Sequence, residues 1–235
     1  MIKPQALTSL TIFFPCYNEY ENLDSMIEQA IRVGENYGVD YEVLVVDDGS
    51  KDGSGEKVKS WSAKNPRVRL IQHEKNQGYG AALRTGYENA RKDLVFMTDG
   101  DNQFHLADID KLFSIIDSCD VAVGFRLSRQ DKPHRRLQGF LWTKLNRLLF
   151  ALPVRDVDCA FKLFRRKCLE GLKLESNQLL IHGETLARLK KKGCAIQEIG
   201  VPHYPRSAGE ATATKPLAVL KTFQELFRLY WRIKQ

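Results

Sequence analysis

The sequence predicts an α/β fold built on a doubly wound, mostly parallel sheet. Along residues 8–125, short apolar or β-branched runs alternate with polar stretches of helical period, which is the pattern of successive β-α units. Polar residues also gather directly after each apolar run, and sheets of this kind bind ligands beyond the carboxyl ends of their strands. A chain of 235 residues can bury a substantial core, so we expect one domain over residues 1–215 and a C-terminal amphipathic helix over 216–235.

The first five strands are expected where apolar and β-branched residues run together. These runs are residues 10–14, 41–47, 67–72, 94–98 and 120–124. The polar stretches between them have helical periodicity, at residues 19–37, 52–64, 78–91 and 106–117. This order of strands and helices predicts parallel strand neighbours.

After residue 125 the regular alternation stops. The expected order is then a helix, a strand, a helix, a strand and a final helix, at residues 134–153, 159–166, 179–193, 195–201 and 216–235. The first of these helices mixes Leu, Phe and Trp with Arg, which is an amphipathic composition. Gly193 is placed to end the second, and Pro216 suits the first turn of the last.

Two local segments make the chain basic. The net charge is +7, yet residues 126–147 hold seven Lys or Arg against one Asp, and residues 215–235 hold five against one Glu. Basic segments of this kind indicate contact with a polyanionic surface. A basic module without catalysis would explain these segments but not the polar strand ends, and no nucleic-acid fold signature is present, so we expect no nucleic-acid partner.

The cysteines and the hydropathy pattern favour a cytoplasmic protein. Five widely spaced cysteines without a C-x-x-C pair indicate neither a disulfide framework nor a zinc site, and a reducing cytosol fits best. No apolar run approaches the roughly 18 residues that cross a bilayer. The first strand begins too soon to leave room for a secretion signal.

The most informative strand end is MTDGDNQFH, residues 97–105. Asp99 and Asp101 stand one residue apart after an apolar run, where their charges repel. The pair is either an ordinary turn or the site of a divalent cation, since Mg²⁺ and Mn²⁺ prefer carboxylate oxygens and would cancel the repulsion. The clustering of polar residues after the other four strands favours the second interpretation.

Two further strand ends predict a nucleotide site. Asp47 and Asp48 close the second strand, where an acidic residue can cap a turn or accept hydrogen bonds from a ribose or a base. NQGYGAALRTG, residues 76–86, is a glycine-rich turn entering a helix, whose N–H groups near Gly80 can cradle a phosphate with Arg84 adding charge. The turn lacks both the Walker lysine and G-x-G-x-x-G, which excludes a P-loop ATPase and a dinucleotide dehydrogenase.

These segments together resemble the family 2 glycosyltransferases with the GT-A fold, and more narrowly the dolichyl or polyprenyl phosphate mannosyl- and glucosyltransferases. The resemblance covers roughly residues 8–215. It rests on the order of FPCYNEYENL, VVDDGSKDGS, KNQGYGAALRTG, TDGDNQF, GFR, DCAFKLFRR, ETLARLKKKG and PRSAGE. The tail after Arg206 departs from the close relatives, because its lysine comes later, as Lys215.

The resemblance implies a site for a GDP- or UDP-linked sugar. Its nucleotide-sugar residues would be Pro15, Tyr17, Glu19, Asp47, Asp48, Gly80, Arg84, Asp99, Gly100, Asp101, Gln103, Arg126, Arg206 and Lys215. Asp99, Asp101 and Gln103 would surround Mg²⁺ or Mn²⁺ and the diphosphate, and Asp99, Asp101 and Arg126 would be the catalytic residues. Neutralising the departing diphosphate would lower the barrier to glycosyl transfer.

The acceptor leaves two alternatives open. A polyprenyl or dolichyl phosphate is already an anion and would need arginines to place it, for which Arg126, Arg129 and Arg135 are candidates. A saccharide hydroxyl would need a general base, for which Asp156, Asp158 and Glu184 are candidates.

The predicted function is therefore a metal-dependent, inverting transfer of mannose or glucose from a nucleotide sugar to a polyprenyl phosphate. The alternative is a family 2 enzyme with a saccharide hydroxyl acceptor. The helices expected at 134–153 and 216–235 have the composition of helices that lie in a membrane interface, which predicts a peripheral protein on the cytoplasmic membrane face. The base, the sugar, the lipid, the preferred metal and the oligomeric state are not specified by the sequence.

Overall fold

The structure of the protein is a computed structural model that describes residues 3–127, 133–205 and 216–234. Within the last two ranges, only the backbone is described for residues 133–135, 216–221 and 223. Among the described residues, no helix combines the length and the apolar character that a membrane crossing requires.

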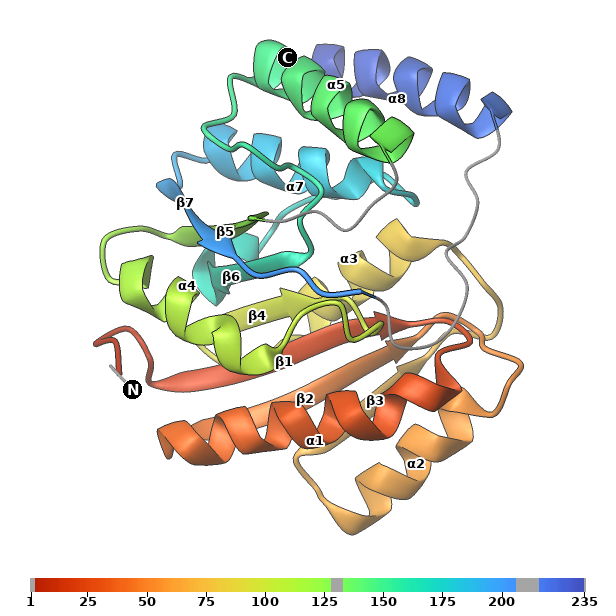
Figure 1. Cartoon of the computed structure of the whole chain (residues 1–235), viewed down its shortest axis with the longest axis vertical. Coiled ribbons are helices and arrows are strands. Elements are labelled where there is room, and N and C mark those ends of the chain that lie inside the picture. The colour runs from red at the N-terminus through yellow and green to blue at the C-terminus, as the bar shows by residue number, and fades with distance from the viewer. Residues whose placement is uncertain (1–2, 128–132, 206–215, 235) are drawn as a thin grey trace.

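A seven-stranded sheet runs through the molecule in the order β3-β2-β1-β4-β6-β5-β7 (Figure 1). Its strands are β1 (Ser9–Cys16), β2 (Asp40–Asp47), β3 (Val68–Gln72), β4 (Leu94–Thr98), β5 (Val121–Arg126), β6 (Phe161–Arg165) and β7 (Ile196–Val201). Only β6 runs against its neighbours, β4 and β5. Because all the other pairings are parallel, the carboxyl ends of six strands meet at one edge.

Helices cover both faces of the sheet. The helices are α1 (Tyr20–Tyr37), α2 (Ser54–Lys64), α3 (Tyr79–Asn89), η1 (Leu106–Asp108), α4 (Ile109–Ile116), α5 (Pro133–Phe150), α6 (Arg166–Leu169), α7 (Leu180–Lys191) and α8 (Pro216–Lys234). Apolar residues of α1, α2 and α4 join one core cluster, and those of α3, α6 and α7 join the other. The sheet is therefore doubly wound, as the sequence predicts.

The strands supply both clusters by alternation. In β1, Ile12 and Phe14 face the α1 side while Phe13 faces the α3 side, and in β4 Phe96 and Val95 divide in the same way. Successive side chains of a strand point to opposite faces, so a strand buried on both faces must be apolar throughout. This explains the uninterrupted apolar runs.

A third layer lies beyond α7, where α5 and α8 pack side by side (Figure 1). Leu180 of α7 is buried against Leu226 and Leu229 of α8, with Trp142 and Leu145 of α5 at the edge of the same cluster. The expected C-terminal helix is thus packed onto the domain through an apolar stripe.

The expected elements are all present, with ends shifted by a few residues. The helix expected over 134–153 ends at Phe150, because Ala151 adopts a positive φ of 52° and Pro153 follows shortly after. The expected helix 106–117 begins with the short 3₁₀ segment η1. The four-residue helix α6 was not predicted.

Candidate active site

The site lies where β1 and β4 adjoin at the carboxyl edge of the sheet. Beyond β1 and β2 the chain connects through α1 and α2 on one face, whereas β4 is entered from α3 on the other face. Such a switch in winding direction opens a crevice for ligands in doubly wound sheets. A Cβ on Gly100 would lie 2.8 Å from the carbonyl oxygen of Pro15, so glycine lets the acidic turn approach the end of β1.

The acidic turn after β4 carries an electrostatic conflict. Burial and the charge of Asp101 raise the pKa of Asp99 to about 7. The hydroxyl of Tyr79 opposes this shift by donating to Asp99 Oδ1 at 2.7 Å. Asp101 is 5% exposed, and its Oδ1 accepts the backbone N–H of Gln103 at 3.1 Å. Two adjacent carboxylates that disfavour each other's charge are a suitable environment for a cation.

The donor set of this turn fits a hard divalent cation. Asp99 and Asp101 offer carboxylate oxygens, and the amide of Gln103 donates through Nε2 to the carbonyl of Tyr204 at 3.3 Å, so its Oε1 is the atom suited to a metal. In the described part of the chain, no three His, Cys, Asp or Glu side chains converge as a metal site. A cation here would therefore need further oxygens from its ligand, as Mg²⁺ commonly does from substrate phosphates.

A second segment is held beside the acidic turn by backbone pairing. Tyr204 N donates to the carbonyl of Gln103 at 2.9 Å, and the ring of Tyr204 packs against His105 with centroids 4.1 Å apart and an interplanar angle of 49°. The chain continues from here toward Arg206 and Lys215, which lie outside the described residues. Arg129 and the side chain of Arg135 also lie outside them.

Arg126 at the end of β5 forms a two-pronged ion pair with Asp156. The Nε–Oδ2 distance is 2.6 Å and the Nη2–Oδ1 distance is 2.8 Å. Nearby, Trp142 of α5 donates its indole N–H to Asp158 Oδ1 at 3.1 Å, and burial raises the pKa of Asp158 to about 6. The structure thus brings Arg126, Asp156 and Asp158 close together, near Asp99 of the acidic turn.

The two acids at the end of β2, which the sequence predicts as nucleotide contacts, are hydrogen-bonded within the fold. Asp47 accepts the N–H of Ser50 at 3.0 Å and the Gln72 amide at 2.8 Å. Asp48 accepts the N–H groups of Gln77 and Gly78, both at 2.9 Å, and contacts His73 at 2.7 Å. Both side chains are almost fully buried. By contrast, Tyr17 at the end of β1 is 45% exposed and open to a ligand.

The residues predicted to cradle a phosphate at the start of α3 are hydrogen-bonded to another loop of the same chain. The N–H of Gly80 donates to the carbonyl of Asn177 at 2.9 Å. Arg84 donates to the carbonyl of Leu174 at 2.8 Å and to Asn177 Oδ1 at 2.9 Å. A Cβ on Gly80 would lie only 2.4 Å from the carbonyl oxygen of Ser176. The donors are engaged by a loop of the same chain, and the glycine permits that close approach.

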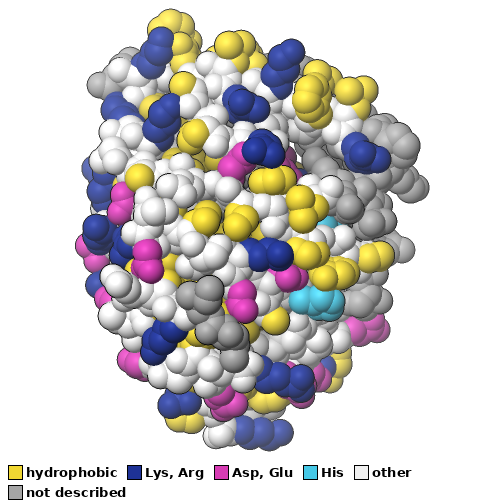
Figure 2. Space-filling view, turned by 60° about the vertical axis from the view of Figure 1, so that its left-hand side comes forward, with side chains coloured by type: hydrophobic (Ala, Val, Ile, Leu, Met, Phe, Trp, Pro, Cys, Tyr) yellow, Lys and Arg dark blue, Asp and Glu magenta, His cyan; other side chains and the backbone are white. Residues whose placement is uncertain are grey.

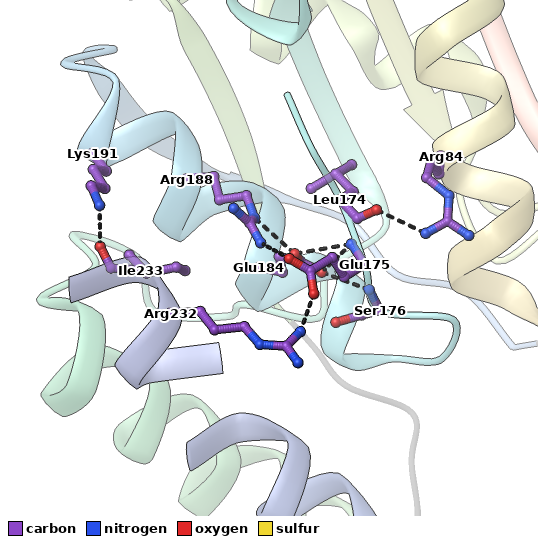
Figure 3. Close-up of polar contacts among 9 residues, drawn as sticks. All are labelled: Arg84, Leu174, Glu175, Ser176, Glu184, Arg188, Lys191, Arg232 and Ile233. Carbon is purple, nitrogen blue, oxygen red and sulfur yellow. Dashed lines mark hydrogen bonds and ion pairs between the residues drawn. The ribbon is translucent and has the colours of Figure 1, made fainter. Parts of the chain in front are cut away.

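Glu184 of α7 organises the same loop (Figure 3). It is fully buried, and its carboxylate accepts the N–H groups of Glu175 and Ser176 and the Nε–H of Arg188. Arg232 of α8 pairs with Glu175 from the other side. A carboxylate with its oxygens occupied in this way holds the loop, and its surroundings give no support to a role as general base.

Three functional candidates were not singled out from the sequence. They are Tyr79, His182 and Lys162, which are hydrogen-bonded to one another beneath Asp99. A signal was present for Lys162, because a lysine interrupts the apolar run AFKLF. Tyr79 and His182 gave none, since a tyrosine in a glycine-rich turn and a histidine in an apolar helix are both ordinary.

The sheet order is that of the GT-A fold, with the acidic turn at its carboxyl edge. The family model described as glycosyl transferase family 2 matches residues 11–172, and the chain belongs to this family.

Curated relatives include dolichyl-phosphate beta-glucosyltransferase ALG5C of Trichomonas vaginalis. It is 32% identical over 179 residues, which cover 69% of this chain and 53% of the relative. Undecaprenyl-phosphate 4-deoxy-4-formamido-L-arabinose transferase of Enterobacter sp. (strain 638) is 30% identical over 217 residues, covering 90% of this chain and 64% of the relative. The chain thus spans about half to two thirds of the length of these two proteins.

Solved structures share the fold. Glucosyl-3-phosphoglycerate synthase from Mycobacterium tuberculosis, in complex with Mn²⁺, UDP-glucose and phosphoglyceric acid, superposes with a TM-score of 0.68 at 19% identity, covering 98% of this chain and 81% of that one. Mannosyl-3-phosphoglycerate synthase from Rubrobacter xylanophilus gives a TM-score of 0.65 at 14% identity, covering 97% and 76%. These similarities confirm the predicted architecture.

Proposed function

We propose that the chain is a metal-dependent, inverting glycosyltransferase that moves glucose or mannose from a UDP- or GDP-linked sugar to a polyprenyl phosphate. The observation that carries the proposal is the acidic turn, where Asp99 and Asp101 meet at the switch point of the sheet and the pKa of Asp99 is raised. Relatives named for dolichyl and undecaprenyl phosphate support the acceptor.

Asp99, Asp101 and Gln103 would hold Mg²⁺ or Mn²⁺ in this proposal. When bound, the cation supplies positive charge that stabilises the departing diphosphate. Tyr17 and Glu19 after β1 would contact the nucleoside, with Pro15, Asp47 and Asp48 behind them. Of these, the exposed Tyr17 ring is suited to stack on a base. Arg206 and Lys215 remain predicted phosphate contacts.

Arg126 would place the acceptor phosphate. The two hydrogen bonds to Asp156 fix the orientation of its planar guanidinium. A phosphate monoester is already an anion near neutral pH, so positioning contributes more to its attack than deprotonation does. Arg129 and Arg135 stay predicted partners of the same phosphate.

A membrane surface is the proposed location of the acceptor. Exposed apolar side chains on α5 and α8 are Leu137, Phe140, Leu141, Leu148, Phe227 and Trp231. Hydrophobic and basic side chains mix at the end of the molecule that these helices form, at the top of Figure 2. Helices with this mixture bind in the headgroup region of anionic bilayers, which would place the protein at the cytoplasmic membrane face.

Vesicle binding tests this location. Replacing both Phe140 and Trp231 by Ser should lower the fraction that co-sediments with anionic vesicles severalfold, because each side chain contributes apolar area to the interface. The control is Tyr20→Ser, which removes a similarly exposed aromatic residue from α1 at the other end of the molecule. Equal binding of all three proteins would contradict the proposed surface.

A hydroxyl acceptor is the second candidate function, and one observation favours it. The pKa of Asp158 is raised to about 6, close to the value that suits a general base at neutral pH. A saccharide hydroxyl would need such a base, whereas a phosphate would not.

The decisive experiment supplies the protein with a short polyprenyl phosphate, UDP-glucose or GDP-mannose, and Mn²⁺ or Mg²⁺. We expect a lipid-linked sugar that forms only with the metal and disappears when EDTA is added. NMR of the product should show an inverted anomeric configuration. Product with an oligosaccharide but with no phosphate acceptor would replace the first function by the second.

A further inference from the structure

A row of polar side chains leads from the buried core, through the half-buried Tyr79, to Asp99. Tyr79 of α3 donates its hydroxyl to Asp99 Oδ1 at 2.7 Å and lies 3.1 Å from His182 Nε2 of α7. His182 Nδ1 in turn lies 3.2 Å from the Lys162 ammonium of β6. Lys162 and His182 are 1% and 2% exposed. Three separate elements thus contribute to one connected network.

The donors and acceptors of this network fit together in only one direction. The single hydroxyl proton of Tyr79 goes to Asp99, so His182 must donate to the tyrosine oxygen from Nε2–H. Burial and the nearby charge of Lys162 lower the pKa of His182 well below its usual range, so the ring is neutral and Nδ1 accepts. Every hydrogen bond from Lys162 to Asp99 therefore points toward the carboxylate.

Lys162 is held by a complete set of acceptors. An ammonium has three donors, and here they meet the carbonyls of Val157 and Cys159 and the Nδ1 of His182. A buried charge is unfavourable unless it is paired and hydrogen-bonded. Burial lowers the pKa of Lys162, and the nearby carboxylates of Asp158, Asp156 and Asp99 oppose that shift. The lysine thus anchors the inner end of the network through its three hydrogen bonds.

The outer end of the network sets how Asp99 meets its ligand. Because Oδ1 accepts from Tyr79, this hydrogen bond restrains the carboxylate and leaves Oδ2 as the oxygen outside the network. Asp99 would then act through one oxygen. Partners that orient a metal-binding side chain commonly affect metal affinity and activity as strongly as many direct contacts.

We propose that Tyr79, His182 and Lys162 are positioning residues that orient Asp99 toward the metal and the sugar. The inference rests on the proposed function, since it assigns these residues to the same cation-dependent site. The network would hold the Asp99 carboxylate in one geometry before ligands arrive, so that no reorganisation is needed during transfer.

Tyr79→Phe is the primary test, because it removes one hydroxyl and keeps the ring. Tyr87→Phe is the matched control: Tyr87 lies on the same helix, its ring packs on Phe13 and Phe164, and none of the hydrogen bonds of the network involves its hydroxyl. The affinity for Mn²⁺ is measured by loss of the free-ion EPR signal, in the presence of whichever of UDP and GDP raises the melting temperature. We expect Tyr79→Phe to weaken Mn²⁺ binding about 10-fold and to lower kcat about 10- to 100-fold, with a change of less than about 2-fold in the KM for nucleotide sugar.

A second pair of variants separates positioning from packing. His182→Gln keeps an N–H donor for Tyr79 and an acceptor for Lys162, whereas His182→Leu keeps only volume. Restored Mn²⁺ affinity and kcat in the Gln variant, with both lost in the Leu variant, would support the network. Melting temperatures of all variants report whether the fold is intact.

The outcomes distinguish the two levels of the argument. If wild-type protein binds Mn²⁺ and nucleotide and transfers sugar, but Tyr79→Phe behaves like Tyr87→Phe, the positioning role is wrong and the proposed function stands. Equal behaviour of His182→Gln and His182→Leu would also overturn the positioning role. If the wild type binds neither Mn²⁺ nor either nucleotide, the proposed function fails, and the inference fails with it.

Discussion

Two turns that look equally suited to a diphosphate are used in different ways by the fold. The acidic turn at Asp99–Gln103 keeps two carboxylates in mutual conflict, and the pKa of Asp99 is raised. At the glycine-rich turn of residues 77–84, the N–H groups of Gln77 and Gly78 donate to Asp48, and that of Gly80 donates to Asn177. The charged form of Asp99 is thus disfavoured in the first turn, while the N–H groups of the second turn are bonded within the protein.

The difference teaches that a motif must be judged by where its polar groups are bonded. A phosphate cradle requires N–H groups without protein partners, and those of a buried turn are usually paired within the fold. In the acidic pair, burial and the charge of Asp101 raise the pKa of Asp99, and the nearby charges of Lys162 and Arg126 offset only part of that shift. Sites for ligands are found where the fold leaves an electrostatic conflict.

The largest expected effect comes from changing the acidic turn. Asp101→Asn should lower kcat/KM for sugar transfer about 10³-fold. The change removes a negative charge that would hold the metal, and the metal would in turn stabilise the departing diphosphate. The melting temperature in the absence of ligand should not fall, because the change also relieves the repulsion with Asp99. Steady-state kinetics and calorimetry measure the two effects.

The control for this variant is Asp108→Asn, which makes the same chemical change on η1 seven residues later. It should leave kcat/KM within about 2-fold of the wild type, since the half-buried Asp108 lies outside the acidic turn. If both variants lost activity equally, the acidic turn would have no special role, and the contrast between the two turns would disappear.

The next effect concerns the glycine-rich turn, and its sign is informative. Helix propensity alone predicts that Gly80→Ala stabilises the protein by up to about 1 kcal/mol. The new Cβ would meet the Ser176 carbonyl at 2.4 Å, so we expect a loss of about 1–3 kcal/mol in the free energy of unfolding. Urea denaturation measures it. If the variant were instead more stable and bound UDP or GDP more weakly, the interpretation of this turn as a phosphate cradle would be favoured.

Local patterns allowed most of the fold to be predicted. The runs LTIFF and LVFMT are buried on both faces, which is why they are apolar without interruption and easy to recognise. The direction of β6 was not predictable, because periodicity gives the same signal for parallel and antiparallel strands. Its antiparallel insertion between β4 and β5 depends on the whole sheet.

The site was predictable only in part. Asp99, Asp101 and Arg126 follow strands, so the rule for carboxyl ends places them at one edge. The partners of Gly80 and Arg84 were hidden, because Leu174 and Asn177 come about ninety residues later and approach only through tertiary packing. The network behind Asp99 was hidden for the same reason, since Tyr79, Lys162 and His182 lie on three distant elements.

Two isosteric variants, Asp158→Asn and Asp48→Asn, compare two buried carboxylates by the pH dependence of the free energy of unfolding. The pKa of Asp158 is raised in the folded state to about 6, above its value in the unfolded chain, so the folded state binds this proton more tightly. Stability from this group is present at low pH and is lost as the pH rises from about 4 through about 6. Asp158→Asn should therefore stabilise the protein by about 1–2 kcal/mol at pH 7.5 and by little at pH 4.

The partner variant, Asp48→Asn, should have the opposite sign at pH 7.5. An amide nitrogen would face an N–H of Gln77 or Gly78 in place of an accepting oxygen, which leaves a buried donor unsatisfied and costs about 1–3 kcal/mol. Thermal unfolding at both pH values checks the pair. If both variants shifted stability in the same direction at pH 7.5, Asp158 and Asp48 would not differ in the way their surroundings predict.

The smallest expected effect comes from Arg84, which the sequence predicts as a phosphate contact and the structure bonds to Leu174 and Asn177. Arg84→Met keeps the length of the side chain and removes both hydrogen bonds, so we expect a loss of about 0.5–1.5 kcal/mol in the free energy of unfolding. The dissociation constant of UDP or GDP, measured by calorimetry with Mn²⁺ present, should change less than about 2-fold, because the guanidinium is engaged away from the acidic turn. A phosphate contact would instead weaken nucleotide binding about 10-fold or more while leaving stability unchanged. The two quantities move in opposite patterns under the two interpretations, so this one variant decides whether the loop at residues 174–178 or the diphosphate is the partner of α3.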